Sequence, residues 1–487
     1  MKHFVSLIFS NKTWLQTILK NTFWVSLSEG IIRLTRAGIV VLMARILGPD
    51  GYGSFAFAFA TVSMFTFIFD AGIASTITRD FAKDARNEKL FPEILSLKLC
   101  LALIGISAIS ISSIFISDDG SVRTIMVILG LYFIVMDFET GLFSFFRARQ
   151  RMEYEALIRV FVSAGLIIAT VIVLWSAASP LNIAYVFLGT ACSSLFITYF
   201  VRRKIVGGQL TIRANPGIWL KFLKSSLPLG ITGATASLYF SLDSTMLGIV
   251  GTLRDTGLYS AVNRIAYFLV LPGTVISSVL IPALSTSTNS GSSLVVRRVN
   301  LWVTLNLALG ALVIAFIWAE SENIVLFLYG NEFLESARPL RWLAITTMLI
   351  YVYYPWYTVL IVYEKQNRLL IATVMGLIVN VVLTLTLIPA FGITGAAIST
   401  IGTHSAVMIG FAIFTGRGTP IVPINSVWVS SAVSSAAAGI AAYAVTALLS
   451  SNIWASIPVC VITFAVIFLA VGKLLGLDTR LKSTEGG

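Results

Sequence analysis

Long blocks of predominantly apolar residues are the feature that most constrains how this chain folds. A helix needs about 20 such residues to cross the hydrocarbon core of a membrane, and a backbone cut off from water can cross only as a helix or a closed barrel. Barrel strands read instead as alternating segments of about ten residues. Because 57% of the residues are hydrophobic and only 11% are charged, the chain has too little polar surface for a water-soluble globule. The predicted fold class is therefore all-α integral membrane.

The apolar blocks predict about 14 transmembrane helices. Cytoplasmic connections of membrane proteins carry the excess of Lys and Arg. Of the 34 basic residues, 24 fall in alternate segments beginning with the amino terminus, 4 fall in the intervening segments and 6 lie inside spans. Both termini are therefore expected in the cytoplasm. The predicted spans are 22–46, 54–75, 91–117, 122–146, 155–178, 180–201, 222–249, 257–284, 298–319, 336–362, 368–389, 391–415, 424–449 and 452–472.

Composition also excludes several classes of ligand. The net charge of +12 is spread over short connections, so topology explains it better than a nucleic-acid partner does. Cys100, Cys192 and Cys460 lie far apart within apolar blocks, and neither a disulfide nor a metal site is expected. The sequence has no GxxxxGK[ST] motif, and no cofactor is expected. Energy would come from a gradient of H⁺ or Na⁺, or from consumption of the transported product.

A weak internal repeat predicts two lobes. The sequence Gly-Pro-Asp-Gly-Tyr-Gly-Ser-Phe-Ala after the first span matches Leu-Arg-Asp-Thr-Gly-Leu-Tyr-Ser-Ala after the seventh when Gly53 is aligned with Gly257. The predicted organisation is listed by residue range: a cytoplasmic segment 1–21, a first lobe of six spans 22–201, a cytoplasmic linker 202–221, a second lobe of six spans 222–415, two further spans 424–472 and a cytoplasmic tail 473–487.

Several short motifs resemble one known family. Ala-Arg-Ile-Leu-Gly-Pro-Asp-Gly-Tyr-Gly at 44–53, followed by Asp-Ala-Gly-Ile-Ala at 70–74, resembles the opening of the Wzx-type polysaccharide or O-antigen flippases of the multidrug/oligosaccharidyl-lipid/polysaccharide (MOP) exporter superfamily. Leu-Asp-Ser-Thr-Met-Leu-Gly at 242–248 and Leu-Ile-Pro-Ala-Phe-Gly-Ile-Thr-Gly-Ala-Ala at 387–397 are similar to later parts of the same family.

This resemblance carries expectations about architecture and function. It implies two six-helix lobes in a V around a central cavity in a bacterial inner membrane, working by alternating access. The implied substrate is an oligosaccharide linked through pyrophosphate to a polyprenol, and the implied partners are membrane lipids, a polysaccharide polymerase and a chain-length regulator.

Charged residues inside spans are costly and mark either wet cavities or ion pairs. On the first span, Glu29, Arg33 and Arg36 fall within about 60° of one another on one helix face. Glu29 and Arg33 are spaced for an intrahelical ion pair, which leaves Arg36 without a partner on its own helix. The stripe is predicted to face the cavity, and Arg36 and Arg33 are candidates for binding the pyrophosphate.

The other intramembrane charges leave two interpretations open. In one interpretation Arg264 binds phosphate across the cavity, and in the other it pairs with Asp243. A guanidinium group can bind a phosphate or a carboxylate through two hydrogen bonds, so both interpretations stay open. Asp70 is a candidate for a cavity or coupling role. His404 is a further coupling candidate, although a lone membrane histidine is more often a hydrogen bond between helices. Structural pairing is the favoured interpretation of Lys98, Asp137, Glu139 and Arg159.

Helix-breaking residues provide hinge candidates in the seventh and eighth spans, although kinks that only shape packing are equally common. These candidates are Pro228, Gly230, Gly233, Pro272 and Gly273.

Two other functions compete with the flippase. A MATE-like cation or drug antiporter is expected to have twelve spans and a cavity rich in unpaired carboxylates, whereas the first span here has two arginines and one glutamate. A membrane glycan polymerase or ligase would have a large outer loop with catalytic charges, and the longest outer segment is only 320–335. The sequence therefore favours a transporter over an enzyme.

Overall fold

The computed structural model describes residues 14–207, 211–273, 292–418, 425–449 and 453–477. Within these ranges every regular element is a helix, so the predicted all-α membrane fold class is confirmed. Contacts divide the chain into two compact units, Met1–Ile249 and Val250–Gly487.

Unit 1 consists of eight α-helices and one short 3-10 helix among the described residues. Their bounds are α2 (Trp14–Met64), α3 (Thr66–Asp70), α4 (Ile73–Lys83), η1 (Ala85–Leu90), α5 (Phe91–Ile116), α6 (Gly120–Ala148), α7 (Met152–Ser176), α8 (Pro180–Val206) and α9 (Pro216–Val250). Because the division follows Ile249, α9 falls in unit 1. The predicted lobe boundary at 202–221 stays a prediction.

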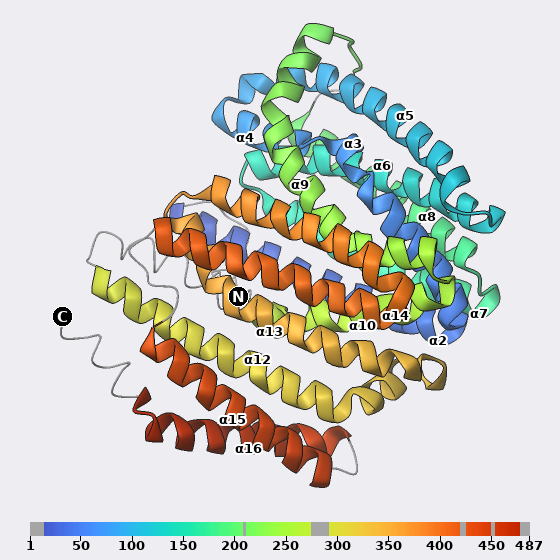
Figure 1. Ribbon diagram of the computed structural model, residues 1–487. Helices are drawn as coiled ribbons and strands as arrows, with labels where there is room; N and C mark the ends of the chain where they lie inside the picture. The colour runs from blue at the N-terminus through green and yellow to red at the C-terminus, as the bar shows by residue number, and fades with distance from the viewer. Residues whose placement is uncertain (1–13, 208–210, 274–291, 419–424, 450–452, 478–487) are drawn as a thin grey trace, which may run out of the picture. The chain divides into compact units, whose positions relative to one another are not determined.

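Unit 2 consists of the remaining helices, coloured from green-yellow to red in Figure 1. Their bounds are α10 (Leu253–Leu269), α12 (Ser292–Tyr329), η2 (Asn331–Ser336), α13 (Ala337–Val362), α14 (Gln366–Gly418), α15 (Ser426–Leu449) and α16 (Ile453–Leu474). The predicted eighth span, 257–284, is described only as far as residue 273.

Ten described segments are long and apolar enough to cross a membrane. Two of them, Lys20–Lys83 with 64 residues and Gln366–Arg417 with 52, are each long enough for two crossings. Both contain a glycine with non-helical backbone angles, Gly48 at φ 68° and Gly392 at φ 55°. These glycines lie where the sequence predicts turns between consecutive spans. Helix α9 is not among these ten segments, because its Gly, Ser and Thr residues lower its mean hydropathy. Helix α10 is not among them either, because its 17 described residues are too few to cross the membrane.

The predicted second span, 54–75, is not one continuous helix. It is divided into the end of α2, the short α3 and α4, with left-handed backbone at Ala71 (φ 44°) and Gly72 (φ 78°). A Cβ added to Gly72 would lie 2.4 Å from the Ser226 carbonyl oxygen of α9. A Cβ added to Gly230 of α9 would lie 2.5 Å from the Ala71 carbonyl carbon. The break therefore lets two backbones meet at a distance that only glycine permits.

Aromatic side chains build the core of unit 1 beside this break. Phe145 of α6 packs against Phe81 and Phe91, with ring centroids 5.1 and 4.8 Å apart. Phe222 of α9 belongs to the same buried cluster. Outside the membrane segments, Asp84 caps η1, and its hydrogen bonds from Arg86 hold the pKa of the Asp84 carboxyl below its usual value.

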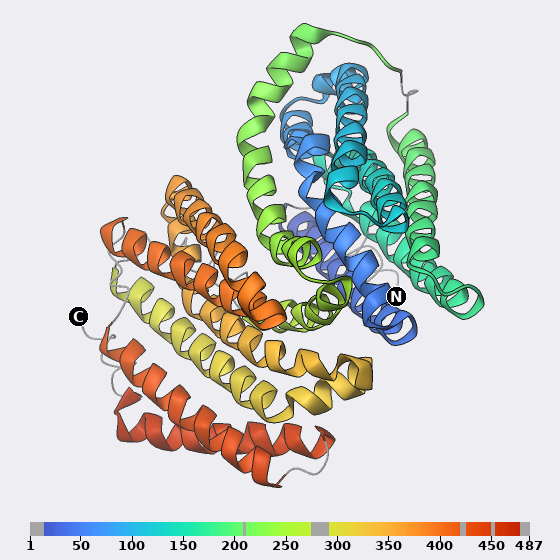
Figure 2. The ribbon, with the colours of Figure 1, turned by 45° about the vertical axis from the view of Figure 1, so that its right-hand side comes forward.

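Small residues hold the last helices of unit 2 together. Figures 1 and 2 both draw α15 and α16 side by side next to α12. Ala311 and Ala315 of α12 pack against Ala438 and Ala442 of α15, as small residues do where membrane helices approach closely. The indole of Trp428 donates a hydrogen bond of 2.9 Å to the Asn300 side chain, which adds a polar contact to this interface.

Candidate functional site

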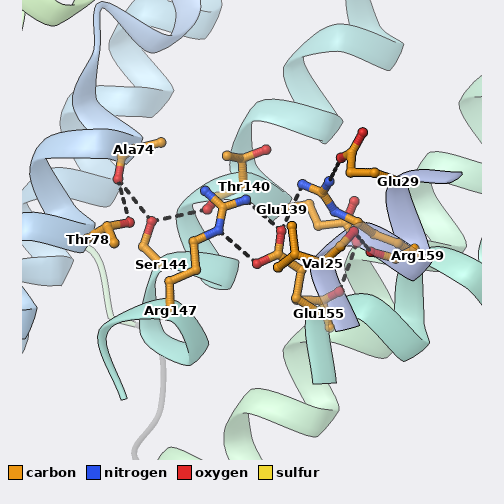
Figure 3. A network of polar contacts seen from close by, with 12 residues as sticks. Val25, Glu29, Ala74, Thr78, Glu139, Thr140, Ser144, Arg147, Glu155 and Arg159 are labelled. Atoms are coloured by element: carbon orange, nitrogen blue, oxygen red, sulfur yellow. Dashed lines mark hydrogen bonds and ion pairs between the residues drawn. The ribbon is translucent and has the colours of Figure 1, made fainter. Parts of the chain in front are cut away.

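A chain of ion pairs joins three membrane helices of unit 1. Arg147, in the last turn of α6, donates from Nε to Glu155 at the start of α7 over 2.8 Å. Arg159, one turn further along α7, contacts Glu155 at 2.9 Å and Glu29 of α2 at 3.3 Å. Figure 3 shows both guanidinium groups pointing toward Glu155, with Arg159 also reaching Glu29. These contacts fix α2, α6 and α7 relative to one another.

The predicted polar stripe on α2 continues this chain. Arg33 contacts Glu29 at 3.6 Å, which confirms the predicted intrahelical pair, and 53% of the Arg33 side chain is exposed. Arg36 is also exposed, and no described carboxylate forms an ion pair with it. Together, α2, α6 and α7 contribute four arginines and three glutamates to this group, because Glu139 of α6 also lies among them. A guanidinium fork binds a phosphate through two hydrogen bonds, so the excess of arginine suits an anionic ligand.

A second charged group lies deeper in unit 1. The Lys98 side chain of α5 is 1% exposed, and its Nζ atom lies 2.8 Å from Asp137 Oδ1 of α6 and 3.6 Å from Asp70 Oδ1 at the end of α3. This confirms the structural pairing expected for Lys98 and Asp137. Asp70 also accepts a hydrogen bond of 2.9 Å from the Ala74 backbone in the first turn of α4.

Other buried carboxylates of unit 1 are satisfied differently. Glu139 of α6 accepts hydrogen bonds from the hydroxyl groups of Ser194 and Thr198 on α8. Glu153 of α7 pairs with Lys20 of α2 at 2.8 Å, and both side chains are buried.

The sequence analysis missed four charged residues of these pairs, because they lie near helix ends, where charged residues look like loop residues. They are Lys20, Arg147, Glu153 and Glu155. The spacing of Glu155 and Arg159 by four residues was the one signal that indicated a pair.

The candidate residues of unit 2 are placed separately. His404 of α14 is buried, and its Nδ1 atom lies 3.0 Å from the Tyr353 hydroxyl of α13, with the two rings stacked. The contact is a hydrogen bond between α13 and α14. It agrees with the structural interpretation of His404, which was the alternative to a coupling role. Arg264 of α10 is exposed. Asp243 is buried on α9 of unit 1, and its proposed link with Arg264 stays a prediction.

Two of the hinge candidates, Gly230 and Gly273, lie at close packing contacts. Gly230 meets the backbone of Ala71, whereas a Cβ on Gly233 would have nothing within 4 Å. A Cβ on Gly273 would lie 2.3 Å from the Tyr351 ring of α13. Pro228 lies inside α9, and Pro272 is exposed. A hinge role for these residues stays a prediction.

Solved structures share this fold. The lipid II flippase MurJ in an inward closed conformation is 14% identical, with a TM-score of 0.75, over 93% of this chain and 99% of that one. An inward-facing multidrug resistance MATE family transporter of the MOP superfamily is 16% identical, with a TM-score of 0.61, over 79% of this chain and 94% of that one. A MOP superfamily transporter from Pyrococcus furiosus, described as having a binding pocket of reversed polarity, is 16% identical with a TM-score of 0.55, over 85% of this chain and 97% of that one.

The helices and the intramembrane charges thus define a multi-pass membrane protein with the fold of the MOP transporters. A search of curated proteins finds no match to the sequence. The family model described as polysaccharide biosynthesis protein matches residues 18–288, which is more than half of the chain. The chain belongs to this polysaccharide biosynthesis family, and the predicted resemblance is confirmed.

Proposed function

We propose that this protein is a flippase that moves a polyprenyl-pyrophosphate-linked oligosaccharide from the cytoplasmic to the periplasmic leaflet of a bacterial inner membrane. The observation that carries the proposal is the exposed face of α2, where two arginines, Arg33 and Arg36, lie beside a single carboxylate, Glu29. The family and the MurJ-like fold support a lipid-linked substrate of this class. A polysaccharide repeat unit such as an O-antigen is the proposed cargo, with a polymerase and a chain-length regulator as partners downstream.

The charge of the stripe favours a pyrophosphate over a cationic drug. Arg36 would bind the phosphate group, and Arg33 would contribute while remaining paired with Glu29. A positively charged drug would be repelled by the same face, which argues against the MATE-like antiporter despite the shared fold. Arg264 and Asp243 are proposed to act on the same substrate from α10 and α9, and alternating access would expose the site to each leaflet in turn.

The test is transport of a defined polyprenyl-pyrophosphate oligosaccharide in proteoliposomes. Arg36→Ala is expected to lower the flipping rate per folded molecule at least tenfold. Arg36→Lys is expected to restore it only partly, because a point charge replaces a fork. Arg45→Ala is the matched control, since Arg45 is also exposed on α2 but nine residues away, which places it on the opposite helix face.

Two outcomes would contradict the proposal. Wild-type protein that leaves the substrate in its original leaflet would exclude the flippase function. Restored transport in Arg36→Ala combined with Glu29→Gln would mean that Arg36 balances a carboxylate instead of binding phosphate. Glu29 already contacts Arg33 and Arg159, so such a rescue is not expected.

A further inference from the structure

We propose that unit 1 has a binding site for an anionic phospholipid of the bilayer, with one acyl chain in an apolar groove and the phosphate among exposed basic residues at the end of that groove. The proposal goes beyond the transport function, because it concerns a lipid that stays bound instead of one that is moved. The site is built from α5, α6 and α8, of which α6 packs against both of the others.

The groove has the size and the lining of a hydrocarbon site. Its volume is about 360 Å³, within the range of about 300–1,000 Å³ that is usual for ligand pockets. No side chain of the lining is charged, so a hydrocarbon chain finds its contacts there, and a headgroup does not. Leu142 is buried at the base, whereas Cys192 and Phe196 are exposed, so the groove is open to a lipid chain. The lining of this acyl groove includes Leu95, Phe138, Leu142, Cys192, Phe196 and Tyr199.

The length of the acyl groove along α8 matches one leaflet of a membrane. Its residues on α8, from Cys192 to Tyr199, are spaced by three and four residues and so share one face of the helix. Arg203 continues this face four residues beyond Tyr199. At 1.5 Å per residue, the rise from Cys192 to Arg203 is about 16 Å, and half of a hydrocarbon core is about 15 Å. A phosphate at Arg203 would therefore place the end of an acyl chain beside Cys192.

Exposed basic residues gather at the end of the groove. Arg203 and Lys204 lie in the last turn of α8, and Arg213 lies in the connection to α9. The Arg213 N–H donates to the Pro92 carbonyl at 3.3 Å, and the Arg213 carbonyl accepts a hydrogen bond of 2.6 Å from the Ser96 hydroxyl. These contacts hold Arg213 against the first turns of α5, next to the groove. The three basic residues, called the basic corner below, thus approach it from α8 and from the α5 side.

The basic corner has the position and the charge of a headgroup site. The Trp219 indole, at the start of α9, donates to the Glu93 carbonyl of α5 at 2.9 Å, and tryptophan is typical of the membrane interface. Between Tyr199 and Trp219 the sequence has four basic residues and no acidic one. Basic pockets between membrane helices on the cytoplasmic side bind anionic headgroups, and the predicted topology places this corner on that side.

Groove and corner together favour a charged phospholipid over other ligands. A soluble anion would use only the corner, and an uncharged lipid would use only the groove. Phosphatidylethanolamine has its own cation, which the corner repels, whereas phosphatidylglycerol has none. The polyprenyl chain of the proposed cargo is much longer than one leaflet and would extend beyond the groove. We therefore assign the site to an anionic phospholipid such as phosphatidylglycerol.

The test is photolabelling of the purified protein in nanodiscs of phosphatidylethanolamine. A small fraction of the lipid is phosphatidylglycerol that carries a diazirine near the end of one acyl chain, and labelled peptides are identified by mass spectrometry. Labelling is expected in the peptides that contain Phe138 and Cys192, which line the groove. The same diazirine chain on phosphatidylethanolamine is expected to label these peptides at least fivefold less, because its headgroup has no net negative charge.

Two variants test the corner and the groove separately. Arg203→Gln combined with Lys204→Gln should lower groove labelling by the phosphatidylglycerol probe about 25-fold, at about fivefold for each basic residue near an anionic lipid. Arg79→Gln combined with Lys83→Gln is the matched control, because it removes one Arg and one Lys that are exposed on α4. Cys192→Trp should fill the groove and lower labelling of the Phe138 peptide to the level of the phosphatidylethanolamine probe. Because Cys192 is exposed, the larger ring leaves the fold intact.

Several results would overturn the lipid site. They are equal labelling of the groove by the two phospholipid probes, labelling of α7 as strong as that of the groove, and equal effects of the two double variants. Stronger labelling of the groove by a polyprenyl phosphate with the same diazirine would assign it to the chain of the cargo and would also refute the proposal. None of these measurements depends on transport, so a protein that flips no substrate would refute the proposed function and leave the lipid site standing.

Discussion

Glu155 is predicted to contribute strongly to the stability of unit 1. Its side chain is 10% exposed, and it contacts the guanidinium groups of both Arg147 and Arg159. In Glu155→Gln, Arg159 keeps its contact with Glu29, whereas Arg147 loses its carboxylate partner among the described residues. Only one guanidinium is then left uncompensated.

The expected loss of unfolding free energy in Glu155→Gln follows from the single guanidinium that is left without a carboxylate. Removing one partner of a buried ion pair costs about 3–5 kcal/mol, and the 28% exposure of Arg147 places this case at the lower end, at about 3 kcal/mol. Glu29→Gln is the control, because its pairs with Arg33 and Arg159 are more exposed and are worth about 0–1 kcal/mol. The difference between the two variants is a factor of roughly 30 or more in the unfolding equilibrium.

Unfolding titrations in mixed detergent micelles would measure both values. Arg147→Gln added to Glu155→Gln should recover most of the loss, because it removes the unpaired charge, and the double-mutant cycle gives the coupling energy directly. A cost below 1 kcal/mol for Glu155→Gln, or a cost equal to that of Glu29→Gln, would refute the reasoning.

Three further predictions concern packing, the histidine and topology. Gly230→Ala should destabilise the protein by about 1–3 kcal/mol in the same titration, because its Cβ would meet the Ala71 backbone, whereas Gly233→Ala should be tolerated. Tyr353→Phe should cost about 0.6 kcal/mol, a typical value for a hydrogen bond between membrane helices, and a loss of several kcal/mol would contradict that role. Reporter fusions should place residues 80–90, residues 202–221 and the carboxyl terminus in the cytoplasm, and an outer location for any of them would overturn the assigned topology.

Local patterns predicted much of the fold. Whether about 20 residues can cross a membrane depends mainly on those residues, so the hydrophobic blocks predicted the helices and the turns near Gly48 and Gly392. The contact between Glu29 and Arg33 was predictable for the same reason, since a spacing of four residues brings two side chains together on any helix.

The break in the second span was not predictable, because its cause lies elsewhere in the chain. Alanine rarely adopts a left-handed backbone, so nothing in the sequence indicates that conformation at Ala71. Gly72 by itself looks like a glycine that only allows two helices to pack closely. What requires glycine there is the approach of α9, whose contacting residues Ser226 and Gly230 follow more than 150 positions later. The contact between Asp70 and Lys98 depends on the same break, since α3 ends at Asp70. The role of Arg147 was hidden similarly, because its partner is on the next helix.

The contacts of α9 with α2 and α3 differ in kind from those between α2 and α7. Ser63 and Ser241 approach through their hydroxyl groups at 2.6 Å, and Thr66 and Ser237 do so at 3.3 Å, without any charge. Neutral hydroxyl pairs tolerate replacement by other small residues one at a time, whereas a buried guanidinium and its carboxylate are replaced safely only together. Over evolutionary time, the interface of α9 with α2 and α3 should therefore change by single exchanges among Gly, Ala, Ser and Thr. The ion-paired helices should change by correlated double substitutions, which would leave a covariation signal in related sequences.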